Sequence, residues 1–225
     1  MSMECTRIYS IHDHAITFEF AEIISEAVNM HVIALKAYTD AHPFEGFIES
    51  VPAYSSLTIY FNKEVNKDKV INIIKTYNSQ LSTVNKKQHT DTKIIPVCYE
   101  LGEDLALIAT TLKLDQEKII SMHCSQTYRV YMIGFTPGFP YMASVPEALE
   151  MPRKKIPSLH IEAGSVAIAG KQTGIYPKNS PGGWHVIGKT PLKMYEKKRS
   201  PACFLKAGDL VKFKPISKEA FYQYQ

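Results

Sequence analysis

Glycine, proline and aromatic residues alternate along the stretch from Gly134 to Trp184, and this composition constrains the fold more than any other feature of the chain. Glycine permits positive φ and lets the main chain approach a ligand closely, whereas proline fixes φ and removes a hydrogen-bond donor. The stretch therefore predicts rigid turns, which could form the wall of a binding pocket. The alternative interpretation is that these turns are only the tight corners of a β-barrel.

The overall composition argues against several classes of protein. The 225 residues allow one large or two small domains, and an apolar share of 45% is enough for a core. The net charge of +4 is mild and the lysines are spread along the chain, so nucleic-acid binding has little support. Residues 1–11 have no long apolar core, and no run reaches the roughly 18 apolar residues of a membrane span. The four cysteines are widely separated, which predicts reduced thiols in a cytoplasmic protein.

The first part of the chain predicts a small α+β domain over residues 1–90. Apolar positions recur with the strand or helix period in six segments. The predicted elements are strands at 14–20, 47–51, 54–61 and 94–98 and helices at 22–38 and 66–81. Read together they give the β-α-β-β-α-β order of a ferredoxin-like sandwich. Residues 82–92 are polar and predict a linker, and the strand at 94–98 could instead open the next domain.

Residues 91–225 predict a β-barrel domain. Two short helices are expected at 104–112 and 116–123, and their apolar positions, including Leu107 and Ile119, favour packing over DNA binding. Beyond them, strands alternate with Pro/Gly turns, and no helix is expected. The predicted strands are 128–133, 166–169, 185–188, 192–195 and 210–215.

No nucleotide, hydrolase or metal motif is complete. Residues 164–171 approach a phosphate loop, but five residues separate the glycines, and Gln172 follows the lysine where Ser or Thr is required. If ATP is used, this loop is not an ordinary nucleotide site. Ser165 lacks the Gly-x-Ser-x-Gly elbow of a hydrolase nucleophile. His12 and His14 would share one face of a strand, but no third ligand accompanies them, so we expect no metal site.

Several residues of the glycine-rich stretch are candidates for a substrate or subunit groove, although none can be assigned a catalytic role. Those that could bind an anionic or amide substrate are Arg153, Lys171, Gln172, Thr173 and the N–H groups of Gly182 and Gly183. The turn and aromatic candidates are Phe135, Pro137, Gly138, Phe139, Tyr141, Tyr176 and Trp184. Arg153 could equally be a plain surface cation. We expect positive φ at Gly182, and hydrogen-bonded structural roles for His123 and His185.

An ordered series of motifs resembles one protein family. The series comprises Gly-Phe-Thr-Pro-Gly-Phe-Pro-Tyr at 134–141, Pro-Arg at 152–153, Ala-Gly-Ser-Val-Ala-Ile-Ala-Gly at 163–170, Gln-Thr-Gly-Ile-Tyr-Pro at 172–177, Ser-Pro-Gly-Gly-Trp at 180–184, Gly-Lys-Thr-Pro at 188–191 and Gly-Asp at 208–209. It is similar to the family of the 5-oxoprolinase B subunit, the Kip-type inhibitor of a sporulation histidine kinase and allophanate hydrolase subunit 1. Further matches upstream extend the resemblance over nearly the whole chain.

The resemblance implies a fold and a function. The expected fold is the small α+β domain followed by a cyclophilin-like β-barrel of the carboxyltransferase type. The expected function is that of the B subunit in an ATP-dependent 5-oxoprolinase, which opens 5-oxo-L-proline to L-glutamate together with the A and C subunits. The alternatives are an inhibitor that binds a sensor histidine kinase and subunit 1 of a urea or allophanate hydrolase. Ser158 stands where the family commonly has a second arginine, which weakens the inference to substrate binding.

Overall fold

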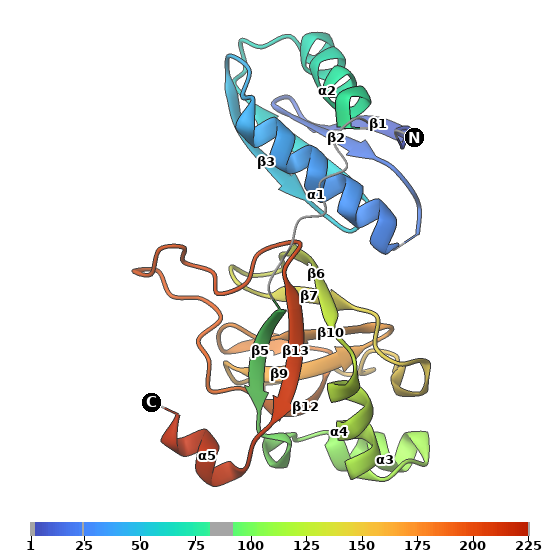
Figure 1. Ribbon diagram of the computed structural model, residues 1–225, viewed down its shortest axis with the longest axis vertical. Helices are drawn as coiled ribbons and strands as arrows, with labels where there is room; N and C mark the ends of the chain where they lie inside the picture. Colours follow the sequence, from blue (N-terminus) through green and yellow to red (C-terminus); the bar gives the residue numbers. More distant parts are fainter. Residues whose placement is uncertain (1–2, 24, 82–91, 225) are drawn as a thin grey trace. The chain divides into compact units, whose positions relative to one another are not determined.

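The computed structural model describes residues 3–23, 25–81 and 92–224 (Figure 1). The chain divides into two compact units, Met1–His89 and Thr90–Gln225. The predicted linker at 82–92 lies outside the described residues except for Thr92, so it stays a prediction.

The first unit is a four-stranded sheet with two helices on one face. Its strand order is β1-β2-β4-β3, and every neighbouring pair is antiparallel. Phe18 and Ile59 of the sheet share one core with Leu35 of α1 and Ile74 of α2, so both helices cover the same face. The elements are β1 (Arg7–His12), β2 (Ala15–Glu19), α1 (Glu26–Ala41), β3 (Phe47–Pro52), β4 (Ser56–Phe61) and α2 (Lys67–Leu81).

The predicted β-α-β-β-α-β order is not observed: it lacks a strand at its start, and its last strand follows the alternative that the sequence left open. An additional strand, β1, precedes the one predicted at 14–20 and pairs with it as a hairpin. The strand predicted at 94–98 belongs to the second unit, where it pairs in parallel with a strand near the C-terminus. Sequence periodicity missed β1 because its side chains are mostly exposed and show no apolar alternation. The ferredoxin-like sandwich is therefore not confirmed.

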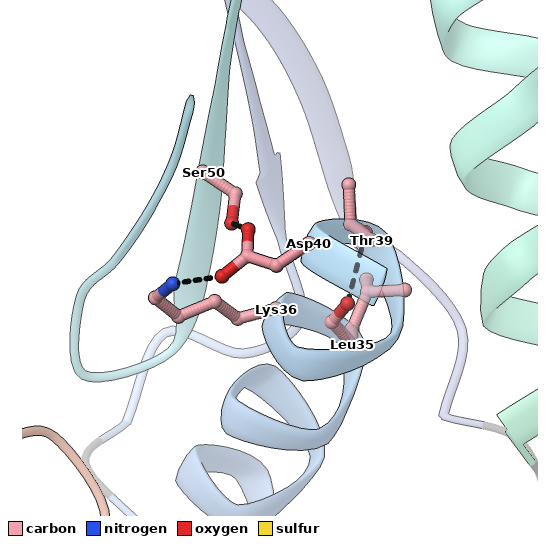
Figure 2. A network of polar contacts seen from close by, with 5 residues as sticks. All are labelled: Leu35, Lys36, Thr39, Asp40 and Ser50. Carbon is pink, nitrogen blue, oxygen red and sulfur yellow. Dashed lines mark hydrogen bonds and ion pairs between the residues drawn. The ribbon is translucent and has the colours of Figure 1, made fainter. Parts of the chain in front are cut away.

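A polar network joins the last turns of α1 to β3, as Figure 2 shows. Asp40 accepts a hydrogen bond from Ser50 of β3 and forms an ion pair with Lys36 one turn earlier in the helix. Thr39, which is completely buried, donates to the Leu35 carbonyl at 2.9 Å. Because Ser50 is also buried, its bond to Asp40 satisfies a hydroxyl that the fold has removed from water. The network fixes the end of α1 against the sheet.

The second unit contains nine strands and three α-helices among its described residues. Most strands are short and are separated by turns that contain glycine or proline. The elements are β5 (Thr92–Val97), η1 (Tyr99–Leu101), α3 (Leu105–Leu112), α4 (Gln116–Ser125), β6 (Tyr128–Ile133), β7 (Pro140–Ala143), η2 (Glu147–Leu149), β8 (Ser158–Ile161), β9 (Ser165–Ala169), β10 (Gln172–Ile175), β11 (Ser180–Gly182), β12 (His185–Lys189), β13 (Leu210–Pro215) and α5 (Lys218–Gln223).

Seven of these strands form a sheet that nearly closes into a barrel (Figure 1). The order is β12-β9-β10-β7-β6-β13-β5, and only β13 and β5 run parallel to each other. Cys98, directly after β5, and Lys189, at the end of β12, exchange two backbone hydrogen bonds of 2.8 and 2.9 Å. This bridge joins the first and last strands of the order. A barrel domain was predicted from the sequence and is observed, whereas its cyclophilin-like character stays a prediction.

Helices α3 and α4 complete the main core of the barrel unit. Ile108 of α3 and Ile119 of α4 are fully buried there with strand residues such as Val130 and Phe213. The expected packing role of Ile119 is therefore confirmed. Leu107, which was also expected to pack, is 54% exposed and lies on the solvent side of α3.

The strand predicted at 192–195 is wrong, because a side chain organises this segment as a loop. Arg199 donates hydrogen bonds to four backbone carbonyls, those of Lys193, Met194, Pro201 and Ala202. These bonds take the place of a strand ladder, of which only a single bridge remains. The short helix α5 near the C-terminus was not predicted either.

Candidate functional site

Four aromatic side chains of the glycine-rich stretch gather on one face of the barrel sheet. We call Phe139, Tyr141, Tyr176 and Trp184 the aromatic cluster. The Phe139 ring lies edge-to-face against Tyr176 at 5.2 Å and against Trp184 at 5.4 Å, and Tyr141 meets Trp184 at 5.7 Å. Such edge-to-face pairs are favoured by the ring quadrupoles. Phe139, Tyr176 and Trp184 are almost completely buried, and Tyr141 is half-buried at the rim.

Strand alternation explains where this cluster lies. Ala167, Ala169 and Val186 point toward the aromatic cluster, whereas their strand neighbours Ile168 and Ile187 point into the main core. The two faces of β9 and β12 therefore support two separate cores. The aromatic cluster is the smaller one, on the side of the sheet opposite to the main core.

The turn that carries Phe139 is rigid, as its composition predicted. The N–H of Thr136 donates to the Gly134 carbonyl at 2.6 Å, and the N–H of Phe139 donates to the Thr136 carbonyl at 3.1 Å. Gly138 has φ +87°, and a Cβ there would lie 2.7 Å from the Cβ of Tyr195, so both conformation and space require glycine.

Phe135 lies at the exposed edge of the same turn. It adopts φ +60°, a conformation that costs a non-glycine residue energy, and its side chain is 63% exposed. Its ring contacts Phe139 at 5.7 Å, while Pro137 in the same turn is exposed. Outliers of this kind gather at functional sites, so Phe135 marks the accessible side of the aromatic cluster.

Arg153 lies beside the aromatic cluster because its two neighbours are tied to the residues on either side of Trp184. The Pro152 carbonyl accepts a hydrogen bond from Nε2 of His185 at 3.0 Å, and the N–H of Lys154 donates to the Gly183 carbonyl at 2.8 Å. These bonds hold the Arg153 backbone opposite Trp184. They also give His185 the hydrogen-bonded structural role that its sequence context indicated.

The Arg153 side chain is exposed, and it has no ion-pair or hydrogen-bond partner among the described residues. Burial raises the pKa of Tyr141 and of Tyr176, and the positive charge of Arg153 opposes that rise at both phenols. The guanidinium therefore lies within electrostatic reach of the two hydroxyls. An unpaired arginine at the rim of an aromatic cluster can bind a carboxylate.

Gly182 is required for a different reason from the one predicted. Its φ is not positive, so the expectation based on backbone conformation is wrong. A Cβ at this position would instead overlap the hydroxyl of Tyr176, only 2.2 Å away. Gly183, in contrast, has room for a Cβ, whose closest contact would be Pro157 at 3.9 Å.

Three predicted groove residues do not join this site. Lys171 lies in the turn between β9 and β10, is 72% exposed and forms an ion pair with Glu150 at 3.6 Å. It precedes β10 whereas Tyr176 follows it, so about 16 Å of extended chain separates the two residues. Gln172 begins the strand at the same end as Lys171. Thr173 is completely buried and points into the main core.

A chain of buried hydrogen bonds explains the position of Thr173. Nε2 of His123 lies 2.9 Å from the Thr173 hydroxyl, which donates to the Ala167 carbonyl at 3.1 Å. Nδ1 of His123 lies 2.7 Å from the Tyr99 hydroxyl, which lies 3.2 Å from Sγ of Cys124. Since the Thr173 proton goes to Ala167, His123 donates from Nε2 and accepts at Nδ1. Burial lowers the pKa of His123 from 6.5 to about 3 and keeps the ring neutral. Its predicted structural role is confirmed.

Sequence reasoning missed the ion pair that supports the Arg153 segment. The ammonium of Lys154 lies 2.7 Å from Asp104, and the same carboxylate accepts the N–H of Val186 at 2.7 Å. Both charged side chains are largely buried. No local sequence signal links them, because fifty positions separate Asp104 from Lys154.

The described ranges were also searched for metal-binding groups, membrane-spanning helices and disulfides. These ranges contain no group of three or more His, Cys, Asp or Glu side chains that could hold a metal ion. None of the helices described is long and apolar enough to cross a membrane. The four cysteines are all free.

Comparison with known families decides the relationship. The model of the family described as carboxyltransferase domain, subdomain C and D, matches residues 6–205. The chain belongs to this family. It is also 40% identical over 231 residues to the 5-oxoprolinase B subunit of Bacillus subtilis, covering 97% of this chain and 96% of that protein. The resemblance seen in the sequence motifs is thereby confirmed.

Two solved structures are also similar. TTHA0988 is 35% identical with a TM-score of 0.82, and the match covers 90% of this chain but only 40% of that longer one. The uncharacterized protein PH0987 from Pyrococcus horikoshii is 36% identical with a TM-score of 0.56, and the match covers 96% of this chain and all of that one. The fold therefore occurs both as a separate chain and as part of a longer polypeptide.

Proposed function

We propose that this chain is the B subunit of an ATP-dependent 5-oxoprolinase complex, which opens 5-oxo-L-proline to L-glutamate as ATP is hydrolysed. The observation that carries the proposal is the similarity to the Bacillus subtilis protein along almost the whole of both chains. Similarity over the full length supports a shared role in a complex, whereas a shared fold alone would not, because one fold hosts many functions.

Arg153, which has no ion-pair or hydrogen-bond partner in the described part of the chain, supplies the substrate side of this proposal. 5-Oxoproline carries one carboxylate, and a guanidinium without a protein partner can hold it through two parallel hydrogen bonds. Tyr141, half-buried beside Arg153, adds a hydroxyl, and the exposed Phe135 ring adds an apolar surface for the methylene groups of the lactam. The chain would thus bind and orient the substrate.

The reaction explains why a complex and ATP are needed. A lactam carbonyl is a poor electrophile, and phosphorylation of its oxygen would make the carbon more reactive toward water. Residues 164–171 lack the spacing of a phosphate loop, so we propose that ATP binds elsewhere in the complex. In this proposal the partners are the A and C subunits of 5-oxoprolinase, and the chain is not active alone.

The test is ATP-dependent glutamate formation from 5-oxoproline by this chain mixed with the A and C subunits, each omitted in turn. Activity should disappear when this chain is omitted. Arg153→Gln should raise KM for 5-oxoproline by about tenfold to a hundredfold, the effect of losing a hydrogen bond between two charged groups. Lys171→Gln is the matched control, because Lys171 lies at the other end of β10 and its exposed ion pair contributes little.

Two outcomes would contradict the proposal at different levels. An equal KM for wild type, Arg153→Gln and Lys171→Gln would remove Arg153 from the substrate site while leaving the subunit assignment intact. No activity from a complex shown to assemble would contradict the assignment itself. It would favour inhibition of a histidine kinase or a role in a urea or allophanate hydrolase.

A further inference from the structure

Ile156 and Leu159 are the most exposed large apolar side chains in the described part of the chain, at 85% and 92%. They lie three positions apart, Ile156 just before β8 and Leu159 within it, and we call residues 155–160 the β8 arm. Single exposed apolar residues are normal on protein surfaces. Two nearly fully exposed ones within four residues are less usual, and the exposure of each shows that other described residues leave it almost uncovered.

The backbone on either side of the β8 arm is held in place. Before it, the ammonium of Lys154 binds the carboxylate of Asp104 at 2.7 Å and the hydroxyl of Ser158 at 3.0 Å. After it, Ile161 is buried and pairs with Ser180 of β11. The backbone of the arm is therefore tied at both ends, so Ile156 and Leu159 are held in a defined arrangement.

The surroundings of the β8 arm are basic. Lys155 precedes Ile156 and is exposed, and Lys178 is exposed just before the strand that pairs with β8. Glu162, the acidic residue that follows β8, is ion-paired with Lys189. A surface that complements the arm should therefore combine an apolar pocket with acidic groups at its rim.

The solved relatives indicate what kind of partner this chain has. In TTHA0988 the fold of this chain accounts for 40% of a longer polypeptide, whereas PH0987 consists of this fold alone. When a fold is fused to a second segment in one relative and stands alone in another, the stand-alone form is expected to bind a separate subunit that corresponds to the fused segment. The remainder of the longer relative thus identifies the class of partner.

We propose that the β8 arm docks into an apolar, acid-rimmed pocket of a second subunit, the one whose sequence corresponds to the remainder of the longer relative. This inference rests on the proposed function, because it assumes that the chain works in a complex. Ile156 and Leu159 are the central contacts, and the surrounding cations orient the encounter.

The test is titration calorimetry of the full chain with that second subunit, chosen by its sequence match to the remainder of TTHA0988. The double variant Ile156→Glu/Leu159→Glu should bind at least about thirtyfold more weakly, because it places two charges in the centre of the interface. The matched control is Leu107→Glu, which changes an exposed leucine of α3 and should bind as wild type does. Melting temperatures are measured for all variants.

Each outcome decides something. Equal binding by wild type and the double variant would overturn the docking role while leaving the complex intact. A melting temperature lowered only in the double variant would show that the arm is covered within its own chain. If the wild type alone forms a dimer and the double variant does not, the partner of the arm is a second copy of this chain. This result, like the lowered melting temperature, would overturn the inference. If the wild type does not bind, and omitting it does not reduce 5-oxoprolinase activity, the proposed function and this inference both fail.

Discussion

His123 should make the stability of the barrel unit depend on pH in a way that one substitution can remove. Its ring is completely buried, stacks on Phe213 at 4.5 Å and has a pKa lowered by burial from 6.5 to about 3. Between these two values the unfolded chain binds a proton at this position and the native protein does not. Stability therefore rises with pH in this window and falls as the solution is acidified.

The size of the effect follows from the pKa difference. Each pH unit below about 6 should lower the free energy of unfolding by about 1.4 kcal/mol through this group. From pH 7.5 to pH 4.5 the loss through His123 amounts to about 2.7 kcal/mol. Other titrating groups contribute to the total, but they cancel when wild type is compared with a variant that lacks only this histidine.

His123→Gln is that variant. At pH 7.5 it should unfold more easily than wild type by about 2–4 kcal/mol, because the hydroxyls of Tyr99 and Thr173 each lose a buried partner. At pH 4.5 the difference should shrink to about 1 kcal/mol or less, since only the wild type has lost the contribution of a neutral buried histidine. The assay is urea unfolding at several pH values, followed by the fluorescence of Trp184, the single tryptophan of the chain.

Thr173→Val separates the effect of the His123–Thr173 hydrogen bond on stability from the effect of His123 protonation. It leaves Nε2 of His123 without an acceptor, which should cost about 1–3 kcal/mol, but it retains the buried histidine. Its difference from wild type should therefore stay constant with pH. If the difference in unfolding free energy between His123→Gln and wild type is also constant with pH, the reasoning is refuted. That result would mean that His123 has the same pKa in the native and the unfolded chain.

Three further experiments test particular contacts by urea unfolding. Gly182→Ala should destabilise the barrel unit by about 1–3 kcal/mol, since its Cβ would overlap the buried Tyr176 hydroxyl; a wild-type midpoint would show that this ring can move. Gly170→Ala should cost only about 1–2 kcal/mol, because its φ of +56° is unfavourable for alanine although the space is open, and a larger loss would contradict that account. The ammonium of Lys93 lies 2.9 Å from the buried carboxylate of Asp209. Lys93→Met should therefore cost about 1–3 kcal/mol, because it leaves that carboxylate without its cation. Adding Asp209→Asn to the same chain should recover part of that loss, because it removes the unpaired charge.

The sequence predicted elements far better than it predicted their partners. Local periodicity located α1, α2 and most barrel strands, because burial of one face imposes a period that can be read within a dozen residues. The strand at β5 was also expected, but its neighbour is β13, more than a hundred positions away. A pairing of that kind leaves no local signal, and the apparent β-α-β-β-α-β order resulted from assigning β5 to the nearest elements in the chain.

The candidate site shows the same limit on a smaller scale. The rigid turns could be predicted, because glycines and prolines mark them in the sequence, whereas the burial of Phe139, Tyr176 and Trp184 in a small core could not. The sequence could not show that Lys171 lies away from Arg153, because nearness to a strand in the sequence does not indicate which end of that strand lies at the site. The backbone bonds on either side of Arg153 finally place it next to Trp184, and these bonds join segments thirty positions apart.

Strand β10 connects stability and function in this unit. Thr173 points from it into the main core and binds His123, whereas a Cβ on the next residue, Gly174, would lie 2.8 Å from Phe139 of the aromatic cluster. Adjacent residues of one strand thus serve opposite faces of the sheet. Substitutions on the His123 side should therefore act on the free energy of unfolding, and substitutions at Arg153 should act on KM. The two sets of variants can be measured independently because a single layer of backbone separates the groups that they alter.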